Sequence, residues 1–220
     1  MIRARPYFLA AVSFLLLAGT GHLSAAEKPA PEASVTAQVH ERIVARSATP
    51  AEVKRAVSIG PLGDRANILH ALYSMRQSAW VRSLLFDLWR DQRKQHPAID
   101  WQSMQSPVLR VALAATMNRI AAGTIPEFLD YLRAQANHEL PLVRAQALMA
   151  LGMNGDAQDI DSLVDGANGA DHYVAQSAIT GLAFMYSQPA HKALAQLAIK
   201  HKDSERGVFI KRILKGAYGS

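Results

Sequence analysis

The sequence predicts an all-α fold, a right-handed α-solenoid of about ten helices in antiparallel pairs with no sheet. Apolar residues recur at helical spacing in one segment after another from Val35 to Leu214. The pattern of one segment also returns at a fixed distance along the chain. No segment has the alternation of apolar and polar residues that marks a half-buried strand.

The repeat is clearest between Pro141 and Ala198. A shift of 31 residues aligns four pairs in one register, namely Val143 with Val174, Ala147 with Ala178, Leu151 with Leu182, and Leu163 with Leu194. Upstream, Pro107-Val108-Leu109-Arg110 matches Pro141-Leu142-Val143-Arg144 at a shift of 34 residues. One helix pair of this size cannot bury its own apolar face, so such periods predict stacked pairs.

The first 26 residues have the features of a secretory signal peptide. Arg3 and Arg5 precede an apolar run over residues 7–18, and Ser24-Ala25-Ala26 supplies the small residues of a cleavage site. The run is shorter than the roughly 20 apolar residues of a spanning helix. We therefore expect cleavage after Ala26, a periplasmic or secreted protein, and no membrane span afterwards; a retained anchor is the alternative.

The rest of the chain divides into three parts. Residues 27–34 are rich in Pro, Ala and charge and predict a flexible lead. Residues 35–105 show helical periodicity and predict N-terminal helical pairs. Residues 106–220 contain the repeats and a last amphipathic segment, which predicts a capping helix with a polar outer face.

Residues able to cap a helix stand before most of the expected helices. Thr49-Pro50-Ala51-Glu52 has the form of a capping box with a first-turn proline. A helix from Trp80 to Gln95 should end before His96-Pro97, because the residue before proline disfavours helical geometry. The other capping candidates are Asp64, Ser106, Thr124, Asp156, Ser187 and either Asp203 or Ser204.

Composition excludes several classes of function. The chain has no cysteine, so it has no disulfide framework, thiolate nucleophile or cysteine-bound zinc. The formal net charge is +6 and falls to about +4 when Arg3 and Arg5 leave with the signal peptide. A charge this mild, without clustered cations and stacking aromatics, predicts no nucleic-acid partner.

The segment PLVRAQALMALGMNGDAQDIDSLVDGA, followed by HYVAQSAITGLAFMYSQPAHKALAQLA, resembles HEAT repeats of the short type first noted in phycobilisome lyases. The matching residues are Val143, Arg144, Ala147, Ala150, Leu151, Gly152, Asp156, Ala157 and Leu163. The resemblance covers residues 107–198. It implies an α-solenoid that binds a protein or peptide along one surface, and it implies no reaction.

No group of residues predicts a catalytic, cofactor or metal site. His40-Glu41 and His138-Glu139 do not continue as His-Glu-x-x-His. The aspartates that could suggest calcium lack the glycine and terminal glutamate of an EF-hand loop, and helix capping with a solvated face explains them better. They are Asp156, Asp159, Asp161, Asp165 and Asp171.

Seven residues are candidates for binding a partner: Trp89, Trp101, Arg110, Arg144, Lys211, Arg212 and Lys215. Trp89 and Trp101 border a polar, basic segment and could form an aromatic contact patch, although core packing remains the simpler interpretation. Arg110 and Arg144 occupy equivalent repeat positions. They could form a cationic strip, but pairing with carboxylates such as Asp130 or Asp165 is favoured.

The basic run from Lys192 to Lys215 is a solvated face or a docking site for an acidic partner or an anionic envelope surface. The leading hypothesis is an exported, non-enzymatic protein-interaction module of the bacterial envelope. One alternative is a metal-dependent enzyme or hydrolase in the N-terminal half, motivated by His40, Glu41, His70 and the tryptophans. The other is a binder of an anionic envelope polymer through the basic C-terminal helix.

Overall fold

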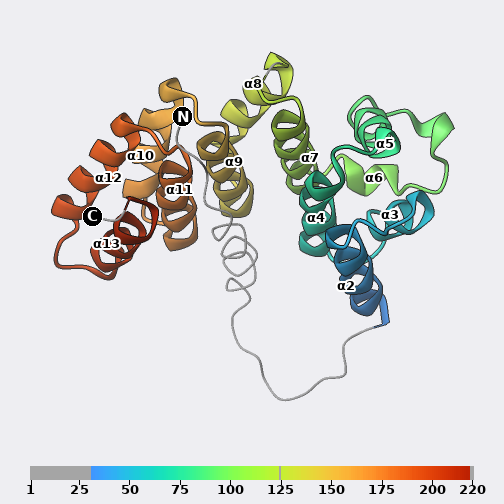
Figure 1. Cartoon of the computed structure of the whole chain (residues 1–220), viewed down its shortest axis with the longest axis horizontal. Helices are drawn as coiled ribbons and strands as arrows, with labels where there is room; N and C mark the ends of the chain where they lie inside the picture. Colours follow the sequence, from blue (N-terminus) through green and yellow to red (C-terminus); the bar gives the residue numbers. More distant parts are fainter. Residues whose placement is uncertain (1–30, 124, 219–220) are drawn as a thin grey trace. The chain divides into compact units, whose positions relative to one another are not determined.

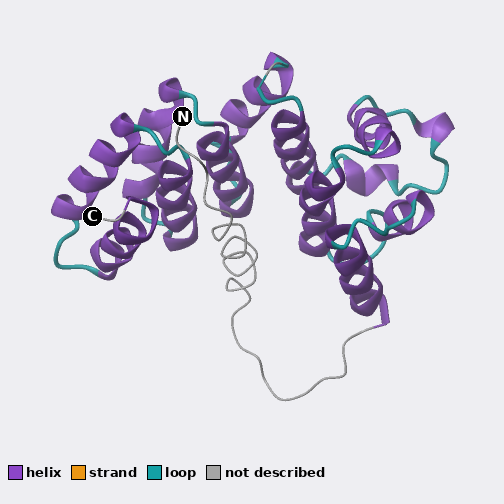
Figure 2. Ribbon diagram, in the orientation of Figure 1, coloured by secondary structure: helices purple, strands orange, loops and turns teal. Residues whose placement is uncertain are grey.

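The computed structural model describes residues 31–123 and 125–218, and of residues 31–34 it describes the backbone alone. The described residues form twelve α-helices, three short 3-10 helices and no strand (Figure 2), which confirms the all-α class. The predicted signal peptide lies outside the described residues. No helix in the described part combines the length and the apolar character that crossing a bilayer requires.

The helices follow one another with short connections (Figure 1). The α-helices are α2 (Pro31–Val44), α3 (Pro50–Ala56), α4 (Leu62–Ala71), α5 (Ala79–Trp89), α6 (Trp101–Met104), α7 (Pro107–Ile120), α8 (Pro126–Gln135), α9 (Pro141–Asn154), α10 (Ile160–Asn168), α11 (His172–Phe184), α12 (Gln188–Lys200) and α13 (Glu205–Tyr218). The 3-10 helices are η2 (Leu72–Met75), η3 (Arg93–Gln95) and η4 (Ala157–Asp159).

Successive helices pack in pairs, and the pairs stack. Helices α2, α4, α7, α9, α11 and α13 each pack on the next member of this series, while α8, α10 and α12 pack beside it. This order is consistent with a HEAT-type solenoid. The described helices outnumber the ten expected, because short elements such as α6 contain too few residues to produce a periodic pattern.

Several predicted caps are present. Thr49 and Glu52 form the expected capping box at α3. Asp156 accepts from the backbone N–H of Gln158, and Ser187 accepts from that of Ala190 at the start of α12. Ser204 accepts from the N–H of Gly207 in the first turn of α13.

Other helix ends differ from the expectation. Helix α2 begins at Pro31, within the segment expected to be a flexible lead. Asp64 lies in the first turn of α4, whose N-cap is Pro61, and the Ser106 side chain makes no capping bond. Thr124 lies outside the described residues. Each difference moves a boundary by a few residues and leaves the order of helices unchanged.

Helix α5 ends at Trp89, six residues before the predicted end at Gln95. Asp91 adopts φ +58°, a left-handed conformation that a continuing helix cannot contain. Its carboxylate accepts from Arg93 Nε at 2.9 Å, and η3 follows. The chain therefore turns ahead of His96-Pro97, where the sequence placed the stop.

The repeat core depends on a close approach of α9 and α11. A Cβ added to Gly152 would lie 2.3 Å from backbone atoms of Gly181, and one added to Gly181 would lie 3.0 Å from the carbonyl oxygen of Leu148. Around this crossing, Leu151, Leu163 and Leu182 are fully buried. The two glycines let the helix backbones touch, and leucines seal the contact.

Candidate partner-binding surfaces

Trp89 is a core residue at the end of α5, with 8% of its surface exposed. Its Nε1 donates to Glu127 Oε1 at 2.6 Å. The ring meets Phe128 and Tyr131 edge to face, with centroids 5.1 and 5.4 Å apart. It therefore joins α5 to α8 and offers no exposed face to a partner.

Trp101, in α6, is also 8% exposed. Its Nε1 donates to the carbonyl oxygen of His96 at 2.9 Å, which holds the loop between η3 and α6. Because both tryptophans are buried with their N–H groups paired, the predicted aromatic contact patch is absent. The sequence showed polar neighbours along the chain, whereas burial depends on neighbours in space.

Arg110 does not pair with Asp130. Its guanidinium lies 3.9 Å from the ring centre of Trp89, and Nη1 donates to the carbonyl oxygen of that residue at 2.9 Å. Burial lowers the pKa of Arg110, while Tyr131, Asp91 and Glu127 act in the opposite direction. The residue closes the end of α5 and stacks on its last side chain.

Arg144, at the equivalent position of the next repeat, does not pair with Asp165. Its Nη1 donates to the carbonyl oxygens of His138 and Glu139 at 2.7 and 2.9 Å, in the loop between α8 and α9. Both arginines donate to backbone carbonyl oxygens, although these lie at different places in the two repeats. The predicted ladder of Arg110 and Arg144 with carboxylates is therefore wrong.

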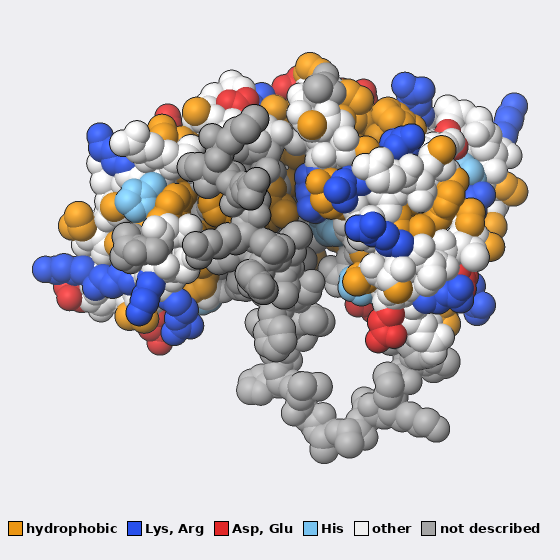
Figure 3. Space-filling model, viewed as in Figure 1, with side chains coloured by type: hydrophobic (Ala, Val, Ile, Leu, Met, Phe, Trp, Pro, Cys, Tyr) orange, Lys and Arg blue, Asp and Glu red, His pale blue; other side chains and the backbone are white. Residues whose placement is uncertain are grey.

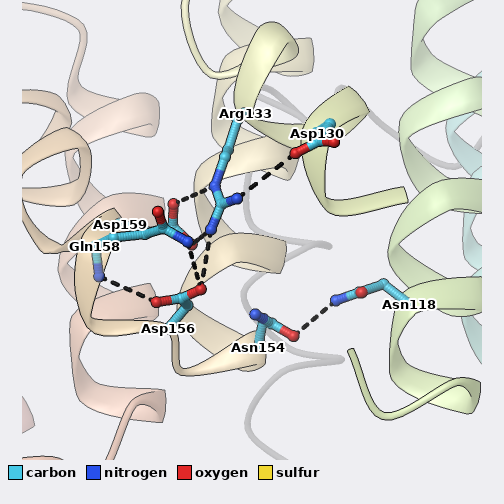
Figure 4. A network of polar contacts seen from close by, with 7 residues as sticks. All are labelled: Asn118, Asp130, Arg133, Asn154, Asp156, Gln158 and Asp159. Carbon is cyan, nitrogen blue, oxygen red and sulfur yellow. Dashed lines mark hydrogen bonds and ion pairs between the residues drawn. The ribbon is translucent and has the colours of Figure 1, made fainter. Parts of the chain in front are cut away.

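An ion-pair cluster that the sequence analysis missed lies between α8 and η4 (Figure 4). Arg133 Nε donates to Asp159 Oδ1 at 2.7 Å, and Nη2 donates to Asp156 Oδ2 at 3.0 Å. Asp130 completes the cluster at 3.6 Å from Nη1. Asp159 lies in the first turn of η4, as expected for a carboxylate near a helix start, but it is 3% exposed and its carboxylate faces Arg133. The cluster connects one helix pair to the next.

Helix α13 presents a basic face. Lys211, Arg212 and Lys215 are exposed, and Val208 on the same face is 56% exposed. Among the described residues no carboxylate forms an ion pair with these three cations. Figure 3 shows Lys and Arg side chains gathered over the end of the chain formed by α12 and α13, at the lower left.

Comparison with known families finds a match for the regular part of the chain. A family model described as HEAT repeats matches residues 102–183. This segment is similar to HEAT repeats over those residues. No curated protein and no solved structure matches the chain. The HEAT segment contains Arg110, Arg144 and the Arg133 cluster, whereas Trp89, Trp101 and the basic face of α13 lie outside it.

The histidine and glutamate pairs are not assembled into a metal centre. Within the described part of the chain, no three His, Cys, Asp or Glu side chains are placed to hold one ion. His138 Nδ1 accepts from the backbone N–H of Leu140 at 3.0 Å, in the loop before α9.

Of the seven candidate residues for binding a partner, the three on α13 are those whose side chains the structure leaves exposed and without an ion pair among the described residues.

Proposed function

We propose that the protein is an exported, non-enzymatic HEAT-repeat module of the bacterial envelope that binds an acidic protein partner. The observation that carries this proposal is the exposed basic face of α13, with Lys211, Arg212 and Lys215 unpaired among the described residues. HEAT repeats commonly mediate protein interactions, which supports a binding role. Export rests on the sequence of residues 1–26, and the short HEAT type rests on the 31- and 34-residue shifts.

The chemistry of this face selects the partner. Lys211 and Lys215 are one turn apart, and Glu205 is the one acidic residue of α13. Close cations of one sign speed encounter with an acidic surface and disfavour a basic one. Val208, between them and the start of the helix, adds an apolar contact. An acidic protein surface with a small apolar patch is complementary to this face.

The test compares two double variants with equal changes in net charge. Lys211→Glu with Lys215→Glu reverses the α13 face, and Arg55→Glu with Lys94→Glu reverses two exposed cations elsewhere. The partner is captured from an envelope extract with the mature full-length chain, purified, and titrated calorimetrically against each form. We expect the α13 variant to bind about tenfold more weakly and the control within about twofold.

Salt and metal measurements complete the experiment. Binding should weaken as ionic strength rises, because exposed charges are screened over about 10 Å at 0.1 M salt. Equal losses in the two variants, or binding of an anionic envelope polymer with no protein partner, would contradict the proposal. Stoichiometric bound metal together with turnover of a small substrate would favour the enzyme alternative instead.

A further inference from the structure

A second cationic cluster lies where the ends of α4 and α7 meet, far along the chain from α13. The ring of Tyr73, in η2, is flanked by two guanidinium groups. Arg119, in the last turn of α7, lies 3.8 Å from the ring centre, and Arg76, directly after η2, lies 4.7 Å from it. Thr116 Oγ1 donates to the carbonyl oxygen of Leu69 at 3.1 Å and fixes α7 against the end of α4.

Among the described residues no carboxylate forms an ion pair with Arg76 or Arg119. Arg76 Nη1 reaches the carbonyl oxygen of Tyr73 at 3.4 Å. Arg82 Nη1 donates to the backbone carbonyl oxygen of Arg76 at 3.0 Å, on the backbone side of the same turn. Two guanidinium groups therefore meet at one aromatic ring without an acidic partner among the described residues.

Four other arginines among the described residues pair with carboxylates. Arg42 pairs with Glu52, Arg93 with Asp91, Arg133 with three aspartates, and the buried Arg65 has Asp100 at 3.6 Å. Arg110 and Arg144 donate to backbone carbonyls instead. Arg76 and Arg119 differ from both groups because their two guanidinium groups share one aromatic ring. Stacking on the Tyr73 ring offsets part of the hydration that the guanidinium groups lose on burial. It does not neutralise their positive charge.

The surroundings of Arg119 disfavour its positive charge. Burial lowers the pKa of Arg119, and Arg76 acts in the same direction. Burial also lowers the pKa of His70, on α4, to about 4, with a further contribution from Arg119. At neutral pH His70 is therefore uncharged, and the positive charge of the cluster belongs to the arginines.

We propose that Arg76 and Arg119 together bind a carboxylate of a partner protein, with Tyr73 as the platform that holds both guanidinium groups in place. Guanidinium groups match the paired oxygens of a carboxylate and form short, charge-assisted bonds to it. The proposal rests on the proposed function only in taking the partner to be a protein. The site is separate from the basic face of α13.

A purely structural role makes a different prediction. Cations near a helix C-terminus interact favourably with the helix dipole, and Arg119 occupies the last turn of α7. This effect and stacking on Tyr73 could retain both arginines without any ligand. In that case an added carboxylate would bind no better here than at other exposed cations.

The test follows local signals by NMR in the mature full-length chain. The probe is a capped pentaglutamate peptide, and the signals are the Nε–Hε resonances of Arg76 and Arg119 and the titration of the His70 ring. Binding should shift both arginine signals along one saturable curve. It should also raise the pKa of His70, because the carboxylate offsets the charge of Arg119.

Variants assign the effect to this site. Arg76→Gln and Arg119→Gln should each weaken the peptide's local affinity about tenfold, and Arg119→Lys less, because lysine keeps the charge but loses the fork. Circular dichroism and urea unfolding check that each variant is folded. Lys211→Glu with Lys215→Glu should leave the local curve unchanged, so failure of the α13 proposal and failure of this one are separable.

Two outcomes would overturn the inference. One is a set of arginine and His70 signals that the peptide does not move in the unmodified protein. The other is a saturable response to inorganic phosphate with none to pentaglutamate, which would identify a phosphate site in place of a carboxylate site. Both are measured without relying on any variant to fold.

Discussion

The HEAT-matched segment and the helices before it solve the same packing problem with different chemistry. In residues 102–183, neighbouring helix pairs meet through a glycine crossing and through Arg133 with its aspartates. Before this segment, Phe86 and Trp89 of α5 pack their rings on Phe128 and Tyr131 of α8, and Arg65 donates to the carbonyl oxygen of Val57 at 2.7 Å. Regular repeats allow one small-residue contact to recur, whereas irregular helices need large side chains to fill unequal gaps.

This difference bears on where partners bind. Inside the HEAT segment, Arg110, Arg133 and Arg144 are occupied by carbonyls or carboxylates. Arg119 near the start of the segment, Arg76 before it and the basic face of α13 after it have no carboxylate partner among the described residues. The repeats therefore act mainly as the frame, and the unpaired cations lie near its first helix and beyond its last one. The following predictions test each half of that contrast.

The largest effect is expected at the glycine crossing. Gly152→Ala places a methyl group where the backbone of Gly181 already lies, so α9 and α11 must move apart. We expect a loss of about 3 kcal/mol in the free energy of unfolding, measured with urea. Gly63→Ala, in α4, is the matched control because an added Cβ meets nothing within 4 Å. That control should be neutral or stabilising by about 0.5–1 kcal/mol. Equal stability of the two variants would show that the helices need no close contact.

The next effect tests the ion-pair cluster. Asp159→Asn removes the buried charge that accepts from Arg133 Nε, and we expect a loss of about 2–3 kcal/mol. Arg133 stays partly solvated and keeps Asp156, which limits the loss. Asp161→Asn, at an exposed position of α10, should change stability by less than about 1 kcal/mol. A double variant with Arg133→Gln should show strong coupling, and additive losses would contradict a direct pair.

Local patterns were enough to predict the regular elements. The 31-residue alignment located α9 to α12, and the residue types at Thr49 and Ser187 located two caps, because each depends on neighbours along the chain. The exposed face of α13 also follows from spacing alone, since Val208, Lys211 and Lys215 lie one turn apart in sequence. Such features can be predicted from the sequence without knowledge of the tertiary packing.

Contacts between distant residues were not predictable in this way. Arg133 meets Asp159 across 26 residues, and the equivalent positions of Arg110 and Arg144 suggested the wrong partners. The stacking of Arg119 on Tyr73 depends on how α7 lies against α4. One sequence signal pointed to an unpaired cation: Arg119 lies in the last turn of a helix that contains no acidic residue. For Trp89 the simpler interpretation, core packing, is confirmed. The contact-patch alternative failed because α5 ends there, so the polar residues that follow Trp89 leave the helix.

A smaller effect concerns pH and compares two histidines. The folded-state pKa of His70 is about 4, below the ordinary value of 6.5. Between these values the unfolded chain binds a proton that the folded chain does not, so stability falls as pH drops from 6.5 toward 4. His70→Gln should remove about 1–2 kcal/mol of the loss between pH 7 and pH 5, measured by urea unfolding.

His201 supplies the comparison from the other end of the chain. Burial, Arg206 and Lys200 also lower its pKa, but the ring lies nearer the surface and its Nε2 donates to Asn168 Oδ1. His201→Gln should therefore change the pH dependence less than His70→Gln. A larger change in the pH dependence of stability for His201→Gln than for His70→Gln would contradict this prediction, because His201 would then be the more strongly shifted histidine.

The smallest effect ranks three helix caps. At Thr49 the side chain accepts from the N–H of Glu52, and Glu52 Oε2 accepts from the Thr49 N–H at 2.8 Å, so Thr49→Ala should lose about 1 kcal/mol. Ser187 accepts a single bond of 3.3 Å from the N–H of Ala190 and has no reciprocal side-chain bond, so Ser187→Ala should lose less. Ser106 makes no capping bond, so Ser106→Ala should change stability by no more than a few tenths, roughly 0.3 kcal/mol. Urea unfolding of the three variants under one condition gives the order. The capping box lies in the irregular N-terminal part, and the single cap of Ser187 lies in the repeats. Ser106 has no capping bond to lose, so a loss of stability in Ser106→Ala equal to that in Thr49→Ala would mean that alanine acts through the unfolded chain and not through the capping bonds.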